Sequence, residues 1–223
     1  MAGLFVARLP DGDVDKLMQL KTGALNNYYR AKVMRYSHNR AKLRALTAAL
    51  LLAKVVNEHC PINFSQTMIT ENEYGKPNII GVADFHFSLS HSGEWVVCAI
   101  DDQPLGVDVQ EICLKTDLDI AERFFSAREA RDLLGLPQID QRDYFFTLWS
   151  LKESFIKAEG KGLSIALDSF EFCVAEPIEL KANESLCAWQ FRLYDLQTGY
   201  KMALCLPHSR FPAMRDWSEL ILE

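Results

Sequence analysis

WSLKESFIKAEGKG, residues 149–162, is the stretch of this sequence that says most about its fold. Apolar side chains recur in and just before it at spacings of three and four, which is typical of an amphipathic helix. The pattern starts at about Gln141, and Gly160 and Gly162 end it. We therefore predict a long helix over about Gln141–Ala158.

One face of this predicted helix combines bulky apolar side chains with charge. Residues three and four apart share a face, which here consists of Trp149, Lys152, Glu153, Ile156, Lys157 and Gly160. A carboxylate and two ammonium groups beside apolar bulk indicate polar groups held on a packed wall, as a metal or phosphate site requires. The alternative is an ordinary amphipathic helix with an i,i+4 pair between Glu153 and Lys157.

The composition is typical of a globular protein. With 49% hydrophobic residues the chain can bury a large core, as one domain or as two halves of about a hundred residues. Its longest apolar run, Ala45–Val56, contains Lys54 and is shorter than the roughly 18 residues that a membrane span needs. We expect no secretory signal in Met1–Val6, which is too short for one. The six cysteines form no C-x-x-C pair, so we expect reduced thiols and a cytoplasmic location.

Positive charge is concentrated in one part of an acidic chain. The net charge is −6, yet residues 16–57 contain nine Lys and Arg side chains and no Asp or Glu, so the remainder carries −15. Such segregation creates a local positive field and indicates anion binding, with a solvated helix face as the alternative. No nucleic-acid recognition motif is present, so we expect a phosphorylated small molecule or an acidic protein partner.

Helical and alternating patterns predict the other elements. A helix is expected from Ser37, as its cap, to about His59, and a second basic helix precedes it near Asn26–Tyr36. A capping box of Ser126 and Glu129 opens a short helix. Strands are expected at Phe85–Ser90, Trp95–Ile100, Leu105–Val109, Ser169–Val174, Ala188–Tyr194 and Tyr200–Leu206. The second and third of these are expected to form a hairpin through the DDQP turn between them.

The order of these elements repeats along the chain. Each long helix is followed by strands, although the two halves share no clear sequence identity. We therefore expect an α+β fold, a pseudo-dimer of two similar halves, each a long helix packed on a small, mostly antiparallel sheet. The halves are expected at residues 1–111 and 112–223, with a ligand site at their interface.

The segment GVDVQ, residues 106–110, adds a second carboxylate. Asp is disfavoured in strands, and the two-residue period puts Asp108 on one face with Gly106 and Gln110. Gly106 would allow a ligand to approach the backbone closely. Asp108 and Glu153, on different elements and accompanied by lysines, suit Mg²⁺ bound through carboxylates and substrate phosphates. The alternative for Asp108 alone is a solvent-exposed residue on an edge strand.

Together these residues resemble a known family, the surfactin-type 4′-phosphopantetheinyl transferases. The resemblance runs from about Arg35 to Leu206. Its most specific motif is W-x-x-K-E-x-x-x-K at 149–157, followed by GKG at 160–162. The other motifs, in order along the chain, are Arg44 in the first long helix, YGKP at 74–77, F-x-x-S-H-S-G at 87–93 and GVD at 106–108.

This resemblance implies an enzyme with a two-half fold. It would transfer 4′-phosphopantetheine from coenzyme A to a serine of an acyl or peptidyl carrier domain of nonribosomal peptide, polyketide or fatty-acid synthesis, releasing adenosine 3′,5′-bisphosphate. Mg²⁺ would be held by Asp108 and Glu153, with Gln110 as a third ligand. Glu153, directly or through a water, would accept the serine proton. Lys157 would stabilise or protonate the departing phosphate, and Lys152 would neutralise the same oxygens.

The resemblance also implies a coenzyme A site and a carrier site. The residues expected to bind coenzyme A are Lys32, Arg44, Lys76, Pro77, Ser90, His91, Asp108, Lys152 and Lys157. Ile112–Phe125 resembles the carrier-contacting region and contains Leu118, Phe124 and Phe125, for which packing between the halves is the alternative. Both halves lie in one chain, so we expect a monomer, without nucleic-acid or membrane partners.

One position departs from the family pattern. Many members have a carboxylate two residues after the aspartate, where this chain has Gln110. A carboxamide oxygen binds Mg²⁺ more weakly, or a water takes its place, so a looser metal site is expected. The same departure supports the alternative function, a non-catalytic coenzyme A-binding regulatory module.

Overall fold

The computed structural model describes residues 2–181 and 189–219. Within them the helices are α1 (Val14–Lys21), α2 (Asn27–Met34), α3 (Asn39–His59), α4 (Ala121–Phe124), α5 (Ala127–Gly135) and α6 (Gln138–Glu159). The strands are β1 (Gly3–Arg8), β2 (Ile69–Glu71), β3 (Pro77–Ile79), β4 (His86–Ser92), β5 (Trp95–Asp101), β6 (Gly106–Glu111), β7 (Glu171–Cys173), β8 (Glu179–Lys181), β9 (Gln190–Tyr194), β10 (Tyr200–Leu206) and β11 (Met214–Asp216).

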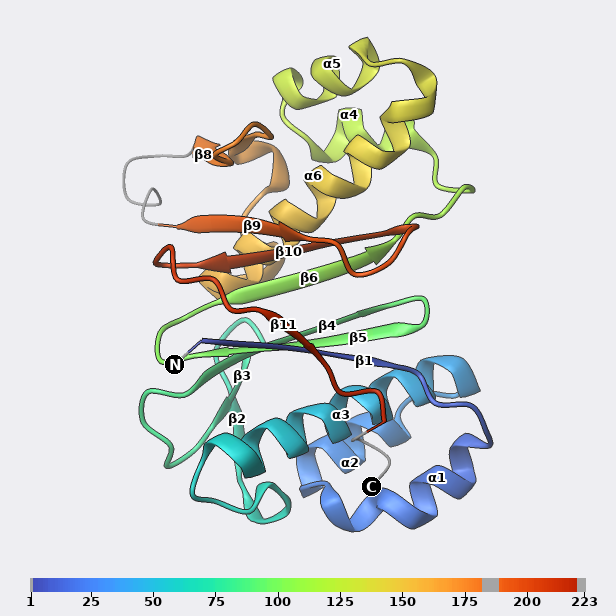
Figure 1. Cartoon of the computed structure of the whole chain (residues 1–223), viewed down its shortest axis with the longest axis vertical. Helices are drawn as coiled ribbons and strands as arrows, with labels where there is room; N and C mark the ends of the chain where they lie inside the picture. Colours follow the sequence, from blue (N-terminus) through green and yellow to red (C-terminus); the bar gives the residue numbers. More distant parts are fainter. Residues whose placement is uncertain (1, 182–188, 220–223) are drawn as a thin grey trace.

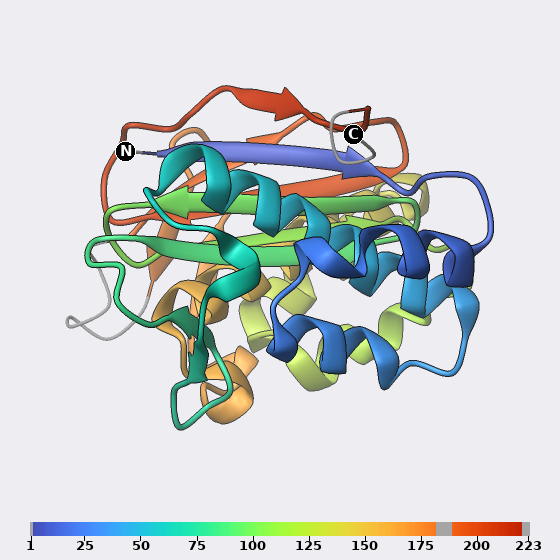
Figure 2. The same ribbon diagram turned by 90° about the horizontal axis from the view of Figure 1, so that it is seen from below.

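The two larger sheets form the middle of a four-layer molecule. One has the strand order β11-β1-β5-β4 and the other the order β6-β10-β9, and all their pairs are antiparallel except β1 with β11. Figure 1 shows α1, α2 and α3 on the outer side of the first sheet and α4, α5 and α6 on the outer side of the second. From below, Figure 2 shows α3 lying across the first sheet, and α1 and α2 pack against α3. The predicted α+β fold of two helix-on-sheet halves is confirmed.

The central strands alternate between two cores because successive side chains point to opposite faces. In β5, Val96 and Cys98 pack toward α3. Val97 and Ala99 of the same strand pack between the two sheets. β10 alternates in the same way between the α6 side and the space between the sheets. This period of two is what lets short sheets stack in the middle of the molecule with helices on both outer sides.

The two sheets meet at their edge strands, β4 and β6, through serine side chains. The hydroxyls of β4 accept hydrogen bonds from backbone N–H groups of β6. These bonds run from Val107 N to Ser88 Oγ (3.1 Å), from Val109 N to Ser90 Oγ (3.2 Å) and from Glu111 N to Ser92 Oγ (2.9 Å). We call these three side chains the serine row.

The predicted hairpin of Trp95–Ile100 with Leu105–Val109 is wrong. These segments are β5 and β6, which lie in different sheets, and the DDQP segment between them crosses from one half to the other. The hairpin is instead formed by β4 and β5, with Gly93 at φ +53° in its turn. Turn residues mark a change of direction, but the partner of each strand depends on distant residues.

Other boundaries shift by up to one turn. Helix α3 starts at Asn39 after His38, so Ser37 does not cap it, and α6 starts three residues before Gln141. The capping box of Ser126 is confirmed, and so is the strand Tyr200–Leu206. Ala188, the expected start of β9, and Cys187 lie outside the described residues.

The sheets do not follow a division of the chain at residue 111. β6 precedes that point but pairs with β10 of the second sheet. β11, near the end of the chain, pairs with β1 of the first sheet. Each half therefore contributes one strand to the sheet of the other: β6 of the first half pairs with β10, and β11 of the second half pairs with β1.

No helix in the described ranges is both long enough and apolar enough to cross a membrane. The cysteines of these ranges, Cys60, Cys98, Cys113, Cys173 and Cys205, are free thiols.

Candidate functional site

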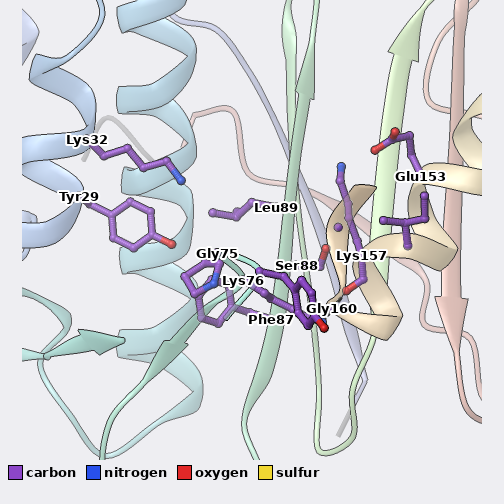
Figure 3. Close-up of a pocket in the computed structure, with 14 residues that line it drawn as sticks. Tyr29, Lys32, Gly75, Lys76, Phe87, Ser88, Leu89, Glu153, Lys157 and Gly160 are labelled. Atoms are coloured by element: carbon purple, nitrogen blue, oxygen red, sulfur yellow. Dashed lines mark hydrogen bonds between the residues drawn. The ribbon is translucent and has the colours of Figure 1, made fainter. Parts of the chain in front are cut away.

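A cleft lies between α2 and α6, beside the junction of β4 and β6. It consists of two adjoining pockets that share Tyr29 and Lys32 from α2, Leu89 from β4, and Glu153 and Lys157 from α6. Figure 3 shows the α2 side chains and the α6 side chains on opposite sides of β4. The first pocket continues toward residues 74–77, and the second toward His91, Asp108 and Gln110. The cleft thus joins residues from both halves of the chain.

Asp108 is brought to the cleft by the close approach of β6 to α6. A Cβ placed on Gly106 would lie 1.9 Å from the backbone oxygen of Ser154, so this position accepts only glycine without movement of the helix. The expectation that Gly106 makes room for a ligand is therefore wrong, because the close neighbour is the backbone of α6. Glycine is needed here to seat the strand that carries Asp108 on the helix that carries Glu153.

Asp108 is buried, with 1% exposure, and its two oxygens accept three hydrogen bonds from side chains. Oδ1 accepts from Ser90 Oγ at 2.8 Å and from Lys157 Nζ at 2.6 Å. Oδ2 accepts from the side-chain amide of Gln110 at 2.9 Å. The interpretation of Asp108 as a solvent-exposed edge residue is excluded, since a buried carboxylate held by an ammonium group belongs to a built site.

Glu153 supplies the second carboxylate. Burial raises the pKa of Glu153, the negative charge of Asp108 raises it further, and Lys157 opposes both effects. Among residues 2–181 and 189–219, no hydrogen bond or ion pair occupies its carboxylate. Two carboxylates that repel each other beside a single ammonium group form a donor set that fits a divalent cation such as Mg²⁺.

Gln110 lines the second pocket but faces Asp108 through its amide nitrogen. That orientation follows from hydrogen bonding, because an amide oxygen would repel the carboxylate. In this arrangement Gln110 holds Asp108, and its role as a metal ligand stays a prediction.

The basic segment of residues 16–57 divides between the cleft and surface ion pairs. Lys32 lines both pockets, while Arg40 pairs with Glu94 and Lys42 pairs with Asp15 at 2.6 Å. The cleft is therefore the place where part of this positive charge is available to an anion.

His91 lies among the remaining cations. His91 is exposed at its surface, but the atoms packed around it partly desolvate the ring, which lowers the pKa of His91, and the positive charges of Arg44, Lys157 and Lys32 lower it further. Of the residues predicted to bind one ligand, Lys32, His91 and Lys157 line the second pocket, whereas Arg44 lines neither pocket and its role stays a prediction.

Lys76 and Pro77 line the first pocket, but the ammonium group of Lys76 is engaged elsewhere. It donates to the backbone oxygens of Leu105 (3.1 Å), Lys157 (2.5 Å) and Ala158 (3.3 Å). Burial lowers the pKa of Lys76 to about 8. Because all three of its donors are used, the prediction that this ammonium holds a phosphate is replaced by a structural role, in which Lys76 joins the loop at residues 72–77 to the end of α6.

Lys152 does not reach the cleft. Its side chain is 1% exposed and its Nζ lies 2.7 Å from Oε2 of Glu129, 2.7 Å from Leu167 O and 2.8 Å from Phe170 O. Burial lowers the pKa of Lys152, and the neighbouring charge of Glu129 opposes this. The predictions that Lys152 binds coenzyme A and neutralises phosphate oxygens are wrong. Glu153 and Lys157 of the same predicted helix face line the cleft, whereas Lys152 forms a buried ion pair inside the second half.

Replacing Lys152 by methionine is expected to destabilise the fold. The change leaves the carboxylate of Glu129, itself 1% exposed, without its ammonium partner, which costs about 3–5 kcal/mol of the free energy of unfolding. Urea unfolding measures this loss, and Lys161→Met, at a side chain with 51% exposure, is the control. A Lys152→Met protein that is fully stable but inactive would contradict this structural role and indicate that Lys152 takes part in the reaction.

The segment 112–125 is only partly packed, since it contains exposed residues such as Leu114 as well as buried ones. Phe125 is 3% exposed, and Leu118 and Phe124 pack partly buried against the same core as α6. Lys115 is exposed. Packing accounts for Phe125, while the partly exposed residues remain a predicted carrier-contacting surface.

Two residues were not predicted in the roles that the structure gives them: Tyr29 lines the cleft, and Glu129 pairs with Lys152 away from it. Tyr29 precedes Lys32 by three residues on α2, so the helical period could have indicated it. Glu129 was recognised only as part of a capping box, and its pairing with Lys152 carries no local signal because the two residues are 23 positions apart.

Comparison with known proteins gives a consistent result along the chain. Residues 15–103 match a family described as 4′-phosphopantetheinyl transferase, N-terminal. Residues 104–205 match the 4′-phosphopantetheinyl transferase superfamily.

Individual relatives agree with these matches. The chain is 42% identical to 4′-phosphopantetheinyl transferase Sfp of Bacillus subtilis (strain 168) over 199 residues, which is 86% of this chain and 88% of the relative. It is 42% identical to 4′-phosphopantetheinyl transferase psf-1 of Bacillus pumilus, over 80% of this chain and 76% of the relative. Among solved structures, a holo-[acyl-carrier-protein] synthase of Thermotoga maritima matches with a TM-score of 0.39 and 24% identity, covering 46% of this chain and 61% of that one.

Proposed function

The chain belongs to the 4′-phosphopantetheinyl transferase superfamily, in its surfactin-type branch, and we propose that its donor is coenzyme A and its acceptor a serine of a carrier protein. The serine oxygen forms a bond to the phosphorus that bears pantetheine. The bond from that phosphorus to the bridging oxygen breaks, and adenosine 3′,5′-bisphosphate leaves with the electron pair. The carrier is an acyl or peptidyl carrier protein.

Glu153 is the proposed acceptor of the serine proton. Its carboxylate faces the cleft, and its raised pKa brings it closer to the range in which a general base is effective near neutral pH. Lys157 lies one helical turn further along α6, where its ammonium group can stabilise the charge on the departing phosphate. The observation that carries the proposal is the meeting of Asp108, Glu153 and Lys157, from two elements, in one cationic cleft.

Asp108 and Glu153 would hold Mg²⁺, which neutralises charge on the pyrophosphate and orients it. Lys32, Arg44 and His91 would bind the phosphates of the donor, Arg44 through the paired donors of its guanidinium group. Binding of the donor phosphates also gives Lys157 a second anionic partner besides Asp108.

Intact-protein mass spectrometry tests this proposal. An apo carrier domain is incubated with the protein, coenzyme A and Mg²⁺, and we expect a mass gain of one phosphopantetheine group that disappears when a chelator is added. Carriers of nonribosomal peptide, polyketide, fatty-acid and lysine pathways would be ranked in the same assay. Absence of any gain, with coenzyme A still bound in calorimetry, would favour the non-catalytic binding module.

Gln110→Glu is expected to tighten the metal site. The change adds a third carboxylate beside Asp108 in place of an amide donor, so without metal it lowers Tm, whereas Mg²⁺ is attracted more strongly. We expect the Mg²⁺ concentration for half-maximal transfer to fall by about tenfold, or about 1.4 kcal/mol. Melting curves with and without Mg²⁺ provide a readout independent of turnover. An unchanged Mg²⁺ requirement would mean that residue 110 does not face the metal.

We also propose that the enzyme works as a monomer in the cytoplasm. The carboxylates and the cations of the cleft come from one chain, and the cysteines of the described ranges are free thiols, which supports a reducing compartment.

A further inference from the structure

The three members of the serine row make the same contact at the junction of the halves, and Ser90 makes an additional hydrogen bond to Asp108. Each hydroxyl accepts one backbone N–H bond from β6. Within the described ranges, Ser90 is the only one of the three that also donates to a side chain, at 2.8 Å to Oδ1 of Asp108. A serine hydroxyl has one proton, so with Val109 N as its donor and Asp108 as its acceptor Ser90 has a defined orientation.

The partners of Asp108 respond differently to a cation. Lys157 is positive and lies 2.6 Å from Oδ1, so a metal ion bound to Asp108 repels it. Ser90 and Gln110 are neutral donors, one to each oxygen, and they can keep their hydrogen bonds when positive charge arrives. Of these two, Ser90 is the more rigidly held, because it is 7% exposed and is bonded to the backbone of β6.

We propose that Ser90 is a positioning residue, whose hydroxyl fixes the Asp108 carboxylate for cation binding and links that carboxylate to the junction of the two halves. This inference rests on the proposed function, since it concerns the cation that transfer requires. It replaces the expectation that the Ser90 hydroxyl donates to a phosphate oxygen of coenzyme A, because its single proton is already donated to Asp108. Outer partners of metal ligands act in this way when they orient the ligand and limit its movement.

Mn²⁺ binding to the full chain tests the inference without turnover. The dissociation constant is obtained from the electron paramagnetic resonance signal of free Mn²⁺, with coenzyme A present and no carrier protein. We expect Ser90→Ala to weaken Mn²⁺ binding by about tenfold, at the lower end of the range for losing an outer partner. Ser92→Ala is the matched control, because it removes the same kind of junction bond without touching Asp108.

Melting curves separate positioning from general damage to the junction. Ser92→Ala loses one bond of the serine row, and Ser90→Ala loses such a bond together with the bond to Asp108. Both variants should therefore lower Tm, Ser90→Ala by more, whereas only Ser90→Ala should lose Mn²⁺ affinity. Ser90→Cys keeps the shape of the side chain but donates only weakly, so its Mn²⁺ affinity should lie between that of Ser90→Ala and that of the unsubstituted chain. It replaces Ser90→Ala in the binding test if Ser90→Ala does not fold.

The inference is overturned if Ser90→Ala, folded, binds Mn²⁺ as tightly as Ser92→Ala, or if Ser90→Cys binds as tightly as the unsubstituted chain. Failure of the proposed function looks different, because the unsubstituted chain itself would then not modify any carrier protein.

Discussion

Gly106→Ala is expected to cost at least about 3 kcal/mol of the free energy of unfolding, and much of the transfer activity with it. The added methyl would overlap the backbone oxygen of Ser154 at 1.9 Å and the backbone nitrogen of Ala158 at 2.4 Å. Neither atom belongs to a flexible side chain, so β6 and α6 must move apart, which places the loss at or above the upper end of the usual cost of overpacking. The movement would separate Asp108 from Lys157. Urea unfolding monitored by circular dichroism measures the change.

Gly135→Ala is the control for this prediction. No heavy atom lies within 4 Å of the position where its Cβ would be built, and the residue ends helix α5, so alanine should be neutral or slightly stabilising there. A Gly106→Ala protein as stable as the Gly135→Ala protein would show that β6 does not sit as closely on α6 as described.

Glu153→Gln is expected to reduce the rate of transfer by at least about a thousandfold, since it removes the proposed general base and one of two metal-binding carboxylates. The fold should be unaffected, because the residue lines both pockets and its carboxylate has no hydrogen bond or ion pair in the described ranges. Removing a carboxylate with a raised pKa relieves repulsion with Asp108, so we expect an equal or higher Tm at neutral pH. Single-turnover mass spectrometry and a melting curve check the two parts.

Glu159→Gln on the same helix is the matched control. Its carboxylate accepts a hydrogen bond from the indole of Trp189 at 2.7 Å, which an amide oxygen can also accept, so transfer should continue. If Glu153→Gln retained more than about a tenth of the rate, another group would have to take the serine proton.

Residue patterns predicted the two long helices and most of the central strands, but they did not predict α1, β1 or β11. The spacing of apolar residues predicted both long helices, and the two-residue period predicted β10 at its observed bounds. The motifs that resemble the transferase family contain Asp108, Glu153, Lys157 and His91, and the basic segment contains Lys32; these five residues line the cleft. Such predictions succeed because period and motif are properties of neighbouring residues.

The same patterns misplaced side chains that share a face or a segment with true cleft residues. Lys152 is adjacent to Glu153, yet it turns to Glu129 and two backbone oxygens of the second half. Lys76 lies in a motif that resembles a coenzyme A-contacting segment, yet its ammonium group binds the end of α6. A lysine side chain is long enough to reach either way, and its direction depends on acceptors far away in the sequence.

The pattern of neighbouring residues thus specifies the long helices, the central strands and the reactive side chains of this chain, because helices and strands arise from the periodic spacing of nearby residues. Which strands pair, why position 106 must be glycine, and how Ser90 comes to hold Asp108 are consequences of packing one half on the other. Those contacts join residues that are distant in sequence, and their energies depend on burial and close fit that exist only once both halves are in place.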